Sequence, residues 1–369
     1  MIRILQVVTH MNRGGLETML MNYYRHIDRE KIQFDFLVHR QERAAYDDEI
    51  ESLGGIIYRL PVLNPFSSVY KSTLEKFFEE HSEYTIIHVH QDCMSSVVLK
   101  IAMKCKVPIR IAHSHCASQD KNLKYPIKLY YKSKIKKYAT HLFACGSEAG
   151  KWMFNGADFE VLNNAIDTSI YQYDIYKRKS MRERYAIDTN VVVIGHVGRF
   201  NYQKNHDFLI DIFEELCKKQ EARLVLIGDG ILQEKIKDKV NQKNLDSKVI
   251  FAGVKNNVAD YLQMMDVFVF PSKYEGLPVT LIEAQATGLP CVVSNRISAE
   301  CIKTDLVEQI SLEDNLKKWV ETILKIGIKE RQGQFNKIKE TGYDIKENVK
   351  VLQNFYENAK TGKGKICLY

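Results

Sequence analysis

Residues 267–284 read VFVFPSKYEGLPVTLIEA, which is an apolar run, a polar turn and a helix-like pattern in direct succession. A short, continuous run of Val and Phe is typical of a strand that is buried on both faces of a parallel sheet. Pro278 suits the first turn of a helix, because proline lacks an N–H and fixes φ at about −65°. The stretch therefore predicts a strand, a loop that carries Glu275, and a helix with Glu283 in its second turn.

The same alternation of strand and helix patterns extends along the chain in two series. The apolar runs of the first series lie at 2–9, 34–39, 56–60, 85–91, 108–114 and 140–145, and those of the second at 191–200, 222–230, 248–254, 266–272 and 290–295. Nearly continuous, β-branched strands between helices indicate a parallel sheet covered on both faces. We predict an α/β protein with two doubly wound, Rossmann-like domains that face each other across a cleft.

The domain boundaries follow from length and polarity. A chain of 369 residues exceeds the size at which one core usually stops growing. The polar stretch 163–180 has no periodicity and separates the two series, so we interpret it as the linker. We expect an N-terminal domain over 1–165, a C-terminal domain over 166–345, and a C-terminal helix and tail over 346–369 that pack back on the N-terminal domain.

Composition argues against several classes of protein. No apolar run approaches the roughly 20 residues of a membrane helix, and MIRILQVV is too short for the core of a signal peptide, so we expect a cytoplasmic protein. The eight cysteines are scattered without a C-x-x-C pair, which argues against a zinc or redox site and suits reduced thiols. No nucleic-acid recognition motif accompanies the net charge of +7.

The segment 121–138 is strongly basic, with seven lysines and no acid. It predicts an amphipathic helix, because lysines recur every four residues and apolar side chains line another face. The lysines are Lys124, Lys128, Lys132 and Lys136, and the apolar residues are Ile127, Tyr131, Ile135 and Tyr138. The lysine face is either simply solvated, or it docks on an anionic membrane surface or a phosphate-bearing acceptor.

Glycines follow several predicted strands, where ligands of open α/β sheets bind. Gly14 and Gly15 open a helix whose N–H groups could hold an anion, although their spacing is not that of the dinucleotide-binding G-x-G-x-x-G. Gly228 lies in IGDG at another strand end. A structural role explains such glycines equally well.

Cations follow one strand of the second series, and acids surround the turn after another. Arg199 and Lys204 stand between a strand and a helix, where two permanent cations can neutralise a diphosphate without a metal. Surface ion pairing is the alternative for these two residues. Glu275 and Glu283 are eight residues apart, but the bend lets both carboxylates face one ligand. Because carboxylates accept hydrogen bonds from hydroxyls, sugars and ribose are suitable partners.

These motifs resemble those of the retaining glycosyltransferases of family 4, which have the GT-B fold. The E-x7-E signature of that family matches Glu275 to Glu283, and its G-R-[FL] and Q-K-N elements match 198–200 and 203–205. The resemblance spans roughly residues 1–360 and points to enzymes that build capsular or exopolysaccharide repeat units. Where the family often has Pro-Asn-Gly at its hinge, this chain has Asn-Asn-Ala at 163–165, so the effect on closure stays open.

The resemblance implies roles for the matching residues. Arg199 and Lys204 would bind the diphosphate of a nucleotide-sugar donor, while Glu283 would bind the ribose and Glu275 the sugar. The remaining donor contacts would come from Gly14, Gly15, Gly228, Gly276, Leu277 and Pro278, the last three at the positive end of a helix. The family also has a histidine near the donor sugar and acceptor. RIAHSHCAS offers His113 and His115, and we favour His115 because it leaves the strand.

The implied activity is retaining transfer of a sugar from a nucleotide diphosphate donor, preferentially UDP-linked, in cell-surface polysaccharide biosynthesis. The expected acceptor is lipid-linked or an oligosaccharide, which would place the protein at the inner face of the cell membrane. We expect no metal and no cofactor besides the donor. Two alternatives stay open: a UDP-sugar epimerase or sugar phosphorylase on the same fold, and a non-catalytic, sugar-nucleotide-binding partner subunit.

Overall fold

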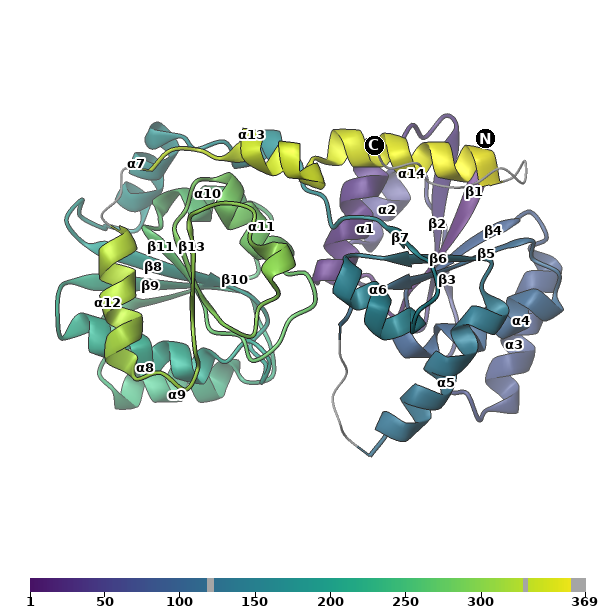
Figure 1. Ribbon diagram of the computed structural model, residues 1–369, viewed down its shortest axis with the longest axis horizontal. Helices are drawn as coiled ribbons and strands as arrows, with labels where there is room; N and C mark the ends of the chain where they lie inside the picture. Colours follow the sequence, from purple (N-terminus) through teal and green to yellow (C-terminus); the bar gives the residue numbers. More distant parts are fainter. Residues whose placement is uncertain (118–122, 328–330, 360–369) are drawn as a thin grey trace. The chain divides into compact units, whose positions relative to one another are not determined.

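The computed structural model describes residues 1–117, 123–327 and 331–359. The chain divides into two compact units: unit 1 consists of Met1–Ile166 and Asp344–Tyr369, and unit 2 of Asp167–Tyr343. In the described residues, each unit contains one sheet of parallel strands with helices on both faces (Figure 1). The predicted α/β class with two doubly wound sheets is therefore confirmed.

The sheet of unit 1 has seven strands in the order β3-β2-β1-β4-β5-β6-β7. The order reverses between β1 and β4, and ligands of such sheets bind at the carboxyl ends beside this reversal. The strands are β1 (Ile2–Val7), β2 (Ile32–Val38), β3 (Ile57–Arg59), β4 (Ile86–Val89), β5 (Ile109–Ser114), β6 (His141–Ala144) and β7 (Glu160–Val161). The helices are α1 (Gly15–His26), α2 (Asp47–Ser52), α3 (Ser68–Glu80), η1 (Asp92–Met94), α4 (Ser95–Lys104), α5 (Tyr125–Tyr138), α6 (Ser147–Phe154) and α14 (Ile345–Ala359).

The sheet of unit 2 has six strands in the order β10-β9-β8-β11-β12-β13, and it reverses between β8 and β11. The strands are β8 (Val192–Val197), β9 (Ala222–Ile227), β10 (Val249–Gly253), β11 (Val267–Phe270), β12 (Cys291–Ser294) and β13 (Val307–Ile310). The longer helices are α7 (Ile175–Arg184), α8 (His206–Cys217), α9 (Gln233–Gln242), α10 (Val258–Met264), α11 (Val279–Ala286) and α12 (Leu316–Gly327). Shorter helical segments are η2 (Thr168–Tyr171), η3 (Asp246–Lys248), η4 (Ala299–Cys301), α13 (Phe335–Ile338) and η5 (Lys339–Tyr343).

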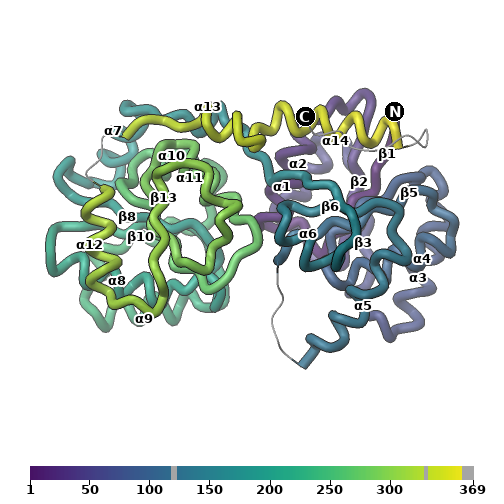
Figure 2. Tube along the Cα trace, viewed as in Figure 1, coloured from purple at the N-terminus to yellow at the C-terminus, as the bar shows by residue number. Residues whose placement is uncertain are grey.

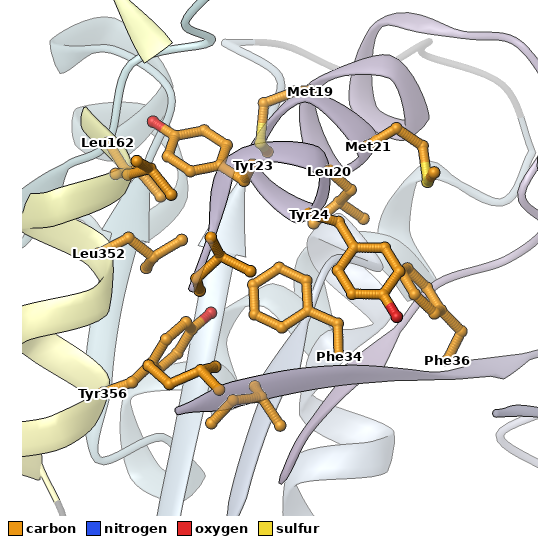
Figure 3. Close-up of a cluster of buried hydrophobic side chains, with 14 of the residues drawn as sticks. Met19, Leu20, Met21, Tyr23, Tyr24, Phe34, Phe36, Leu162, Leu352 and Tyr356 are labelled. Atoms are coloured by element: carbon orange, nitrogen blue, oxygen red, sulfur yellow. The ribbon is translucent and has the colours of Figure 1, made fainter. Parts of the chain in front are cut away.

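The core of unit 1 draws on both ends of the chain. Every residue of β2 is buried, as expected of a strand covered on both faces. Tyr24 of α1 stacks on Phe34 of β2 with ring centroids 5.4 Å apart, and Tyr356 of α14 meets Phe34 edge-on at 5.9 Å (Figure 3). The C-terminal helix α14, yellow in Figure 2, therefore packs against elements formed by the first forty residues.

Residues 163–180, which we interpreted as the linker, contain the boundary between the two units, but the second half of the segment is helical. Residues Thr168–Tyr171 form η2, and α7 begins at Ile175. The Asp174 carboxylate caps α7 by accepting hydrogen bonds from the N–H groups of Tyr176 and Lys177 at 2.8 and 3.2 Å. Only Met181 and Arg182 of α7 are buried, so the helix has no apolar periodicity that the sequence could reveal.

None of the helices in the described part of the chain is both long and apolar enough to cross a bilayer. Seven of the eight cysteines lie in the described residues, and all seven are free thiols. Cys367 and the tail from 360 onward lie outside the described residues, as do Lys121 and Asn122 of the predicted basic helix.

Candidate functional site

The topology of unit 2 brings the loops after β8 and β11 side by side. The two strands pair in parallel, with Val267 opposite Ile194. Two further hydrogen bonds join the loops: Lys273 N–H donates to the Gln203 carbonyl at 2.8 Å, and the Asn205 side chain donates to the Pro271 carbonyl at 3.1 Å. The cationic and acidic motifs of the sequence thus meet at one sheet edge.

The centre of this edge is an ion pair between the two motifs. Lys204 Nζ lies 2.8 Å from Glu275 Oε1, and Gln203 Nε2 donates to Glu275 Oε2 at 3.1 Å. Only 15% of the Lys204 side chain and 6% of the Glu275 side chain are exposed. Lys204 Nζ also lies 4.5 Å from the ring centroid of Phe270. A largely desolvated cation beside a carboxylate can contact a phosphate and a hydroxyl of the same ligand.

Arg199 is exposed in the same loop, and its backbone is held by the loop after β9. Phe200 N–H donates to the Asp229 carbonyl at 2.7 Å. Gly228 has φ of +133°, and a Cβ there would lie 2.2 Å from the Gly198 carbonyl oxygen. Glycine is therefore required at this position to let the two loops approach.

The loop after β11 ends at α11, as the proline predicted. Pro278 is the N-cap residue, with φ −72° and ψ 106°, and Leu277 beside it is nearly buried. Two hydroxyls that flank this loop are buried without a hydrogen-bond partner among the described residues: Ser272 Oγ, shortly after β11, and Thr280 Oγ1, in the first turn of α11. Neither was predicted from the sequence, and a buried unpaired hydroxyl in the first turn of a helix is suited to an anionic or polar ligand.

Glu283 lies in α11 and is buried, with 6% exposed. The Tyr171 hydroxyl donates to Glu283 Oε1 at 2.6 Å. Burial raises the pKa of Glu283 to about 7, while the Tyr171 hydrogen bond opposes the rise. The partners of the two acids therefore differ, since Glu275 pairs with Lys204. Tyr171 was missed because it lies in the polar stretch 163–180, which has no periodicity that would predict a helix.

In unit 1 the first predicted contact is the glycine pair at the start of α1. Gly14 is the N-cap in an extended conformation, and its carbonyl accepts from Thr18 N–H at 2.9 Å. A Cβ added at Gly15 would meet no atom within 4 Å. Packing within unit 1 therefore does not require glycine at position 15, in contrast to Gly228.

Histidines gather at the ends of β4 and β5. Four of them form a stacked group with a buried glutamine and a tyrosine, which we call the histidine chain: His88, His90, His113, His115, Gln6 and Tyr356. Burial lowers the pKa of each of the four histidines, and that of His115 to about 3. The imidazoles are therefore neutral at physiological pH.

Of the two histidines in the sequence motif, His113 lies inside β5 and is 1% exposed, whereas His115 follows the strand and is half-buried. The His115 N–H donates to Asp92 Oδ1 at 3.2 Å. One nitrogen of each of His88, His90 and His113 lies within 4.8 Å of the others, a spacing that could hold a metal ion. Hydrogen bonds within the histidine chain already engage nitrogens of all three rings. The cavity beside the histidine chain has a volume of about 10 Å³ and is too small for a sugar.

Helix α5 confirms a helix over most of the basic segment, but its faces differ from the prediction. On the predicted apolar face, Ile135 is buried and Tyr131 and Tyr138 are half-buried, whereas Ile127 is 39% exposed. Lys132 Nζ lies 4.1 Å from the Trp152 ring centroid, and Lys136 Nζ donates to the Asn155 carbonyl at 3.3 Å. Half of the predicted lysine stripe therefore turns toward α6, because long lysine stems cover apolar surface while their ammonium groups seek partners.

Two family models match the chain. Residues 13–170 match "Glycosyltransferase Family 4", and residues 177–344 match "Glycosyl transferases group 1". Together they cover the glycine pair, the histidines and the Lys204–Glu275 pair.

Whole-chain relatives carry related descriptions. The chain is 37% identical over 379 residues to the putative glycosyltransferase EpsF of Bacillus subtilis, covering 98% of this chain and 97% of that one. It is 26% identical to the capsular polysaccharide biosynthesis glycosyltransferase CapH of Staphylococcus aureus, covering 96% and 99%. It is 25% identical, over 66% of each chain, to UDP-Gal:alpha-D-GlcNAc-diphosphoundecaprenol alpha-1,3-galactosyltransferase of Escherichia coli.

Among solved structures, Anabaena HepE in complex with UDP is similar with a TM-score of 0.79 and 16% identity, covering 98% of this chain and all of that one. At this identity the likeness shows the fold. That fold, in which two parallel α/β sheets carry the strand-end sites, is the one that the motifs of the sequence led us to expect.

Proposed function

We propose that this chain, which belongs to glycosyltransferase family 4 and has the GT-B fold, transfers a sugar from a UDP-linked donor to a lipid-linked or oligosaccharide acceptor. Its similarity to the capsular polysaccharide biosynthesis glycosyltransferase CapH supports a role in building cell-surface polysaccharide. The observation that carries the proposal is the desolvated Lys204–Glu275 pair at the strand reversal of unit 2.

The donor diphosphate takes its charge compensation from Lys204 and Arg199, together with the N-terminus of α11 at Gly276, Leu277 and Pro278. Each well-placed donor group of this kind contributes about 3–4 kcal/mol to stabilisation of a leaving group. Lys204 is suited to the task because most of its side chain is shielded from water. UDP as the nucleotide is supported by the complex of HepE with UDP.

The hydroxyls of the donor are assigned to the acids. Glu283 binds the ribose and Glu275 binds the transferred sugar, so that Lys204 bridges the sugar-binding carboxylate and the phosphate. Gly228 sets the loop geometry beneath Arg199, as its close contact with Gly198 indicates. Gly14 and Gly15 at the start of α1 let a phosphate approach the backbone, which the open space at Gly15 supports.

The reaction retains the anomeric configuration by a front-face route. The bond from the sugar C1 to the diphosphate oxygen breaks, the acceptor oxygen bonds to C1 from the same side, and the acceptor proton passes to the departing diphosphate. His115 contacts the sugar or the acceptor hydroxyl. Compensation of the leaving-group charge by fixed cations is the reason that we propose neither a metal nor a cofactor.

The acceptor is assigned to the N-terminal domain, residues 1–165, and the donor to the C-terminal domain, residues 166–345. A diphospho-polyprenol acceptor is supported by the name of the Escherichia coli relative. A peripheral position at the inner membrane face is supported by α5, which exposes Ile127 and Tyr130 beside its lysines.

The test is a turnover assay with UDP-galactose, UDP-glucose and their GDP counterparts, with and without a polyprenyl-diphosphate sugar acceptor. We expect acceptor-dependent release of UDP that is lost in Lys204→Ala, and thermal stabilisation by UDP that is weakened in the same variant. An epimerised sugar formed without acceptor, or release that requires inorganic phosphate, would contradict the proposal. So would UDP binding without turnover unless a second protein is added.

A further inference from the structure

The histidine chain is a single line of hydrogen bonds whose direction is set by one amide. In the structure the Gln6 Oε1 atom faces His90 Nε2 at 2.9 Å. An amide oxygen can only accept, so His90 carries its proton on Nε2 and leaves Nδ1 bare. His90 Nδ1 lies 2.9 Å from His115 Nε2, which must therefore be the donor. Gln6 thus fixes His115 with a proton on Nε2 and a bare Nδ1.

The other end of the Gln6 amide continues the line in the same sense. Gln6 Nε2–H donates to the Tyr356 hydroxyl at 3.3 Å, and His88 Nδ1, at 2.7 Å, is the one acceptor in the line for the buried phenol proton, so the hydroxyl donates to it. His88 then carries its proton on Nε2 and donates to His113 Nδ1 at 3.1 Å. Every link has one donor and one acceptor, and reversing the amide of Gln6 would require every proton in the line to change place.

The two ends of the line differ in position. At one end His113 Nε2 is buried inside the sheet without a partner among the described residues. At the other end His115 Nδ1 is likewise buried without a partner among them, but His115 lies beyond the end of β5 and other parts of the residue are exposed. A bare imidazole nitrogen beyond the carboxyl end of a strand is a hydrogen-bond acceptor, which suits a sugar hydroxyl.

We propose that Gln6 and Tyr356 are positioning residues that hold His115 as a neutral acceptor, with Nδ1 directed to a hydroxyl of the sugar or the acceptor. This inference rests on the proposed function, because it takes His115 to contact substrate. Gln6 comes from β1 and Tyr356 from α14, where Figure 3 shows it, and both side chains are fully buried. Neither residue touches substrate, so both act through His90.

Tyr356 matters because it gives the Gln6 amide a reason to keep its orientation. Without the phenol oxygen, Gln6 Nε2–H has no acceptor in the line, and the amide gains nothing from pointing its oxygen at His90. Either face of the amide can then meet His90, and His115 divides between its two neutral tautomers. Only one of the two leaves Nδ1 bare.

The first measurement is made without substrate, by long-range proton–nitrogen correlation NMR of the histidine-labelled full chain, with His115 assigned through His115→Gln. We expect His115 in the Nε2–H tautomer in the wild type and a tautomer mixture in Tyr356→Phe and Gln6→Met. A wild-type His115 protonated on Nδ1, or unchanged tautomers in both variants, would overturn the inference. Release of bound zinc on denaturation would overturn it too, because the imidazoles would then be ligands.

The second measurement is steady-state kinetics. Loss of one hydrogen bond in such a line corresponds to a fall of about three- to tenfold in kcat, with little change in the KM of the donor. Tyr70→Phe is the matched control. Tyr70 is also a buried tyrosine, and its hydroxyl lies 2.8 Å from His39 Nε2, but neither residue belongs to the histidine chain. An equal fall in kcat in Tyr70→Phe at equal thermal stability would overturn the positioning role. Absence of transfer by the wild type would refute the proposed function instead.

Discussion

The two units share one topology but equip its strand ends in opposite ways. At the reversal of the unit 2 sheet, a lysine and a glutamate form a desolvated ion pair, with an exposed arginine in the same loop. At the corresponding edge of unit 1, neutral imidazoles, an amide and a phenol form the histidine chain. Fixed charges are suited to binding a phosphate. Neutral groups are suited to binding hydroxyls, and their burial avoids the free-energy penalty of desolvating a charge. The same fold can therefore present charged groups at the strand ends of one unit and neutral hydrogen-bonding groups at those of the other.

The largest effect should come from removing the cation of the charged edge. Lys204→Ala should lower kcat/KM by about 10²–10³-fold, because the leaving diphosphate loses a preorganised positive group. Steady-state turnover with the preferred UDP-sugar measures it. Lys218→Ala, which removes an exposed partner of Glu215 at the end of α8, is the control and should leave turnover unchanged. A loss under threefold in Lys204→Ala would mean that the charge of this edge is structural.

Alanine at Gly228 in unit 2 and alanine at Gly15 in unit 1 should have different effects on the free energy of unfolding. Gly228→Ala should lower the free energy of unfolding by about 2–3 kcal/mol, because φ is +133° and the new Cβ would meet the Gly198 carbonyl. Gly15→Ala should change it by less than about 0.5 kcal/mol, since that Cβ meets no atom within 4 Å, yet it should weaken binding of the donor. Denaturant unfolding and UDP titration test the pair. Equal destabilisation by both would remove the contrast.

Glu283, the buried acid of α11, should make nucleotide binding depend on pH. Burial raises the pKa of Glu283 to about 7, and the ionised carboxylate is the better acceptor for ribose hydroxyls. Affinity for UDP should therefore rise by about tenfold between pH 6 and pH 8, the change in the ionised fraction of a group with that pKa. The histidine chain of unit 1 should not add to the pH dependence of UDP binding between pH 6 and pH 8, because burial lowers the pKa of each of its histidines well below this range.

Two variants sharpen that expectation. Glu283→Gln should bind UDP weakly at all pH values between 6 and 8, by calorimetry. Tyr171→Phe should move the midpoint to higher pH, because the lost hydrogen bond had favoured the ionised form.

The raised pKa of Glu283 also affects the stability of the fold. The free energy of unfolding should fall as pH rises from the unfolded pKa of about 4.5 to the folded pKa of about 7, because the buried carboxyl resists ionisation. Glu283→Gln should make this fall smaller.

The smallest effect concerns charge that unit 1 does carry, on the outside of α5. Reversal of Lys124 and Lys137, which are both exposed, should weaken binding to vesicles of anionic lipid, at about 1 kcal/mol per lysine near the surface. Reversal of Lys128 and Lys132 is the matched comparison: both are half-buried, and Lys132 packs on Trp152, so it should lower stability more than vesicle binding. Identical vesicle binding by both double variants would argue against a docking face on this helix.

The sequence predicted those parts of the fold in which local pattern and burial agree. The stretch 267–284 produced a buried strand and a helix capped at Pro278, because apolar runs and a proline act locally. Strands β7 and β13 were missed, since one has two residues and the other is exposed at its centre. Helix α7 was missed because its packing surface contains almost no apolar side chain.

The candidate site shows the same division. Lys204 and Glu275 were named from their motifs, and the parallel pairing of β8 with β11 explains why residues so far apart in sequence form an ion pair. Of the histidine chain, His113 and His115 were named from the sequence. Tyr171, Gln6 and Tyr356 could not be anticipated, because their hydrogen-bond partners come from distant elements. The faces of α5 were only half right, because lysine spacing does not reveal which stems pack inward.

Helix α14 has a consequence for how the protein is made. Ile345, Val349, Leu352, Phe355 and Tyr356 belong to the same core as β1, β2 and α1, although all of unit 2 is translated in between. Strands β1 and β2 must therefore wait, with an apolar flank open, until unit 2 and then α14 have been synthesised. Unit 2 is continuous and can complete its fold first. The order of maturation is thus expected to run against the order of synthesis, and the nascent first half is the stretch most in need of a chaperone.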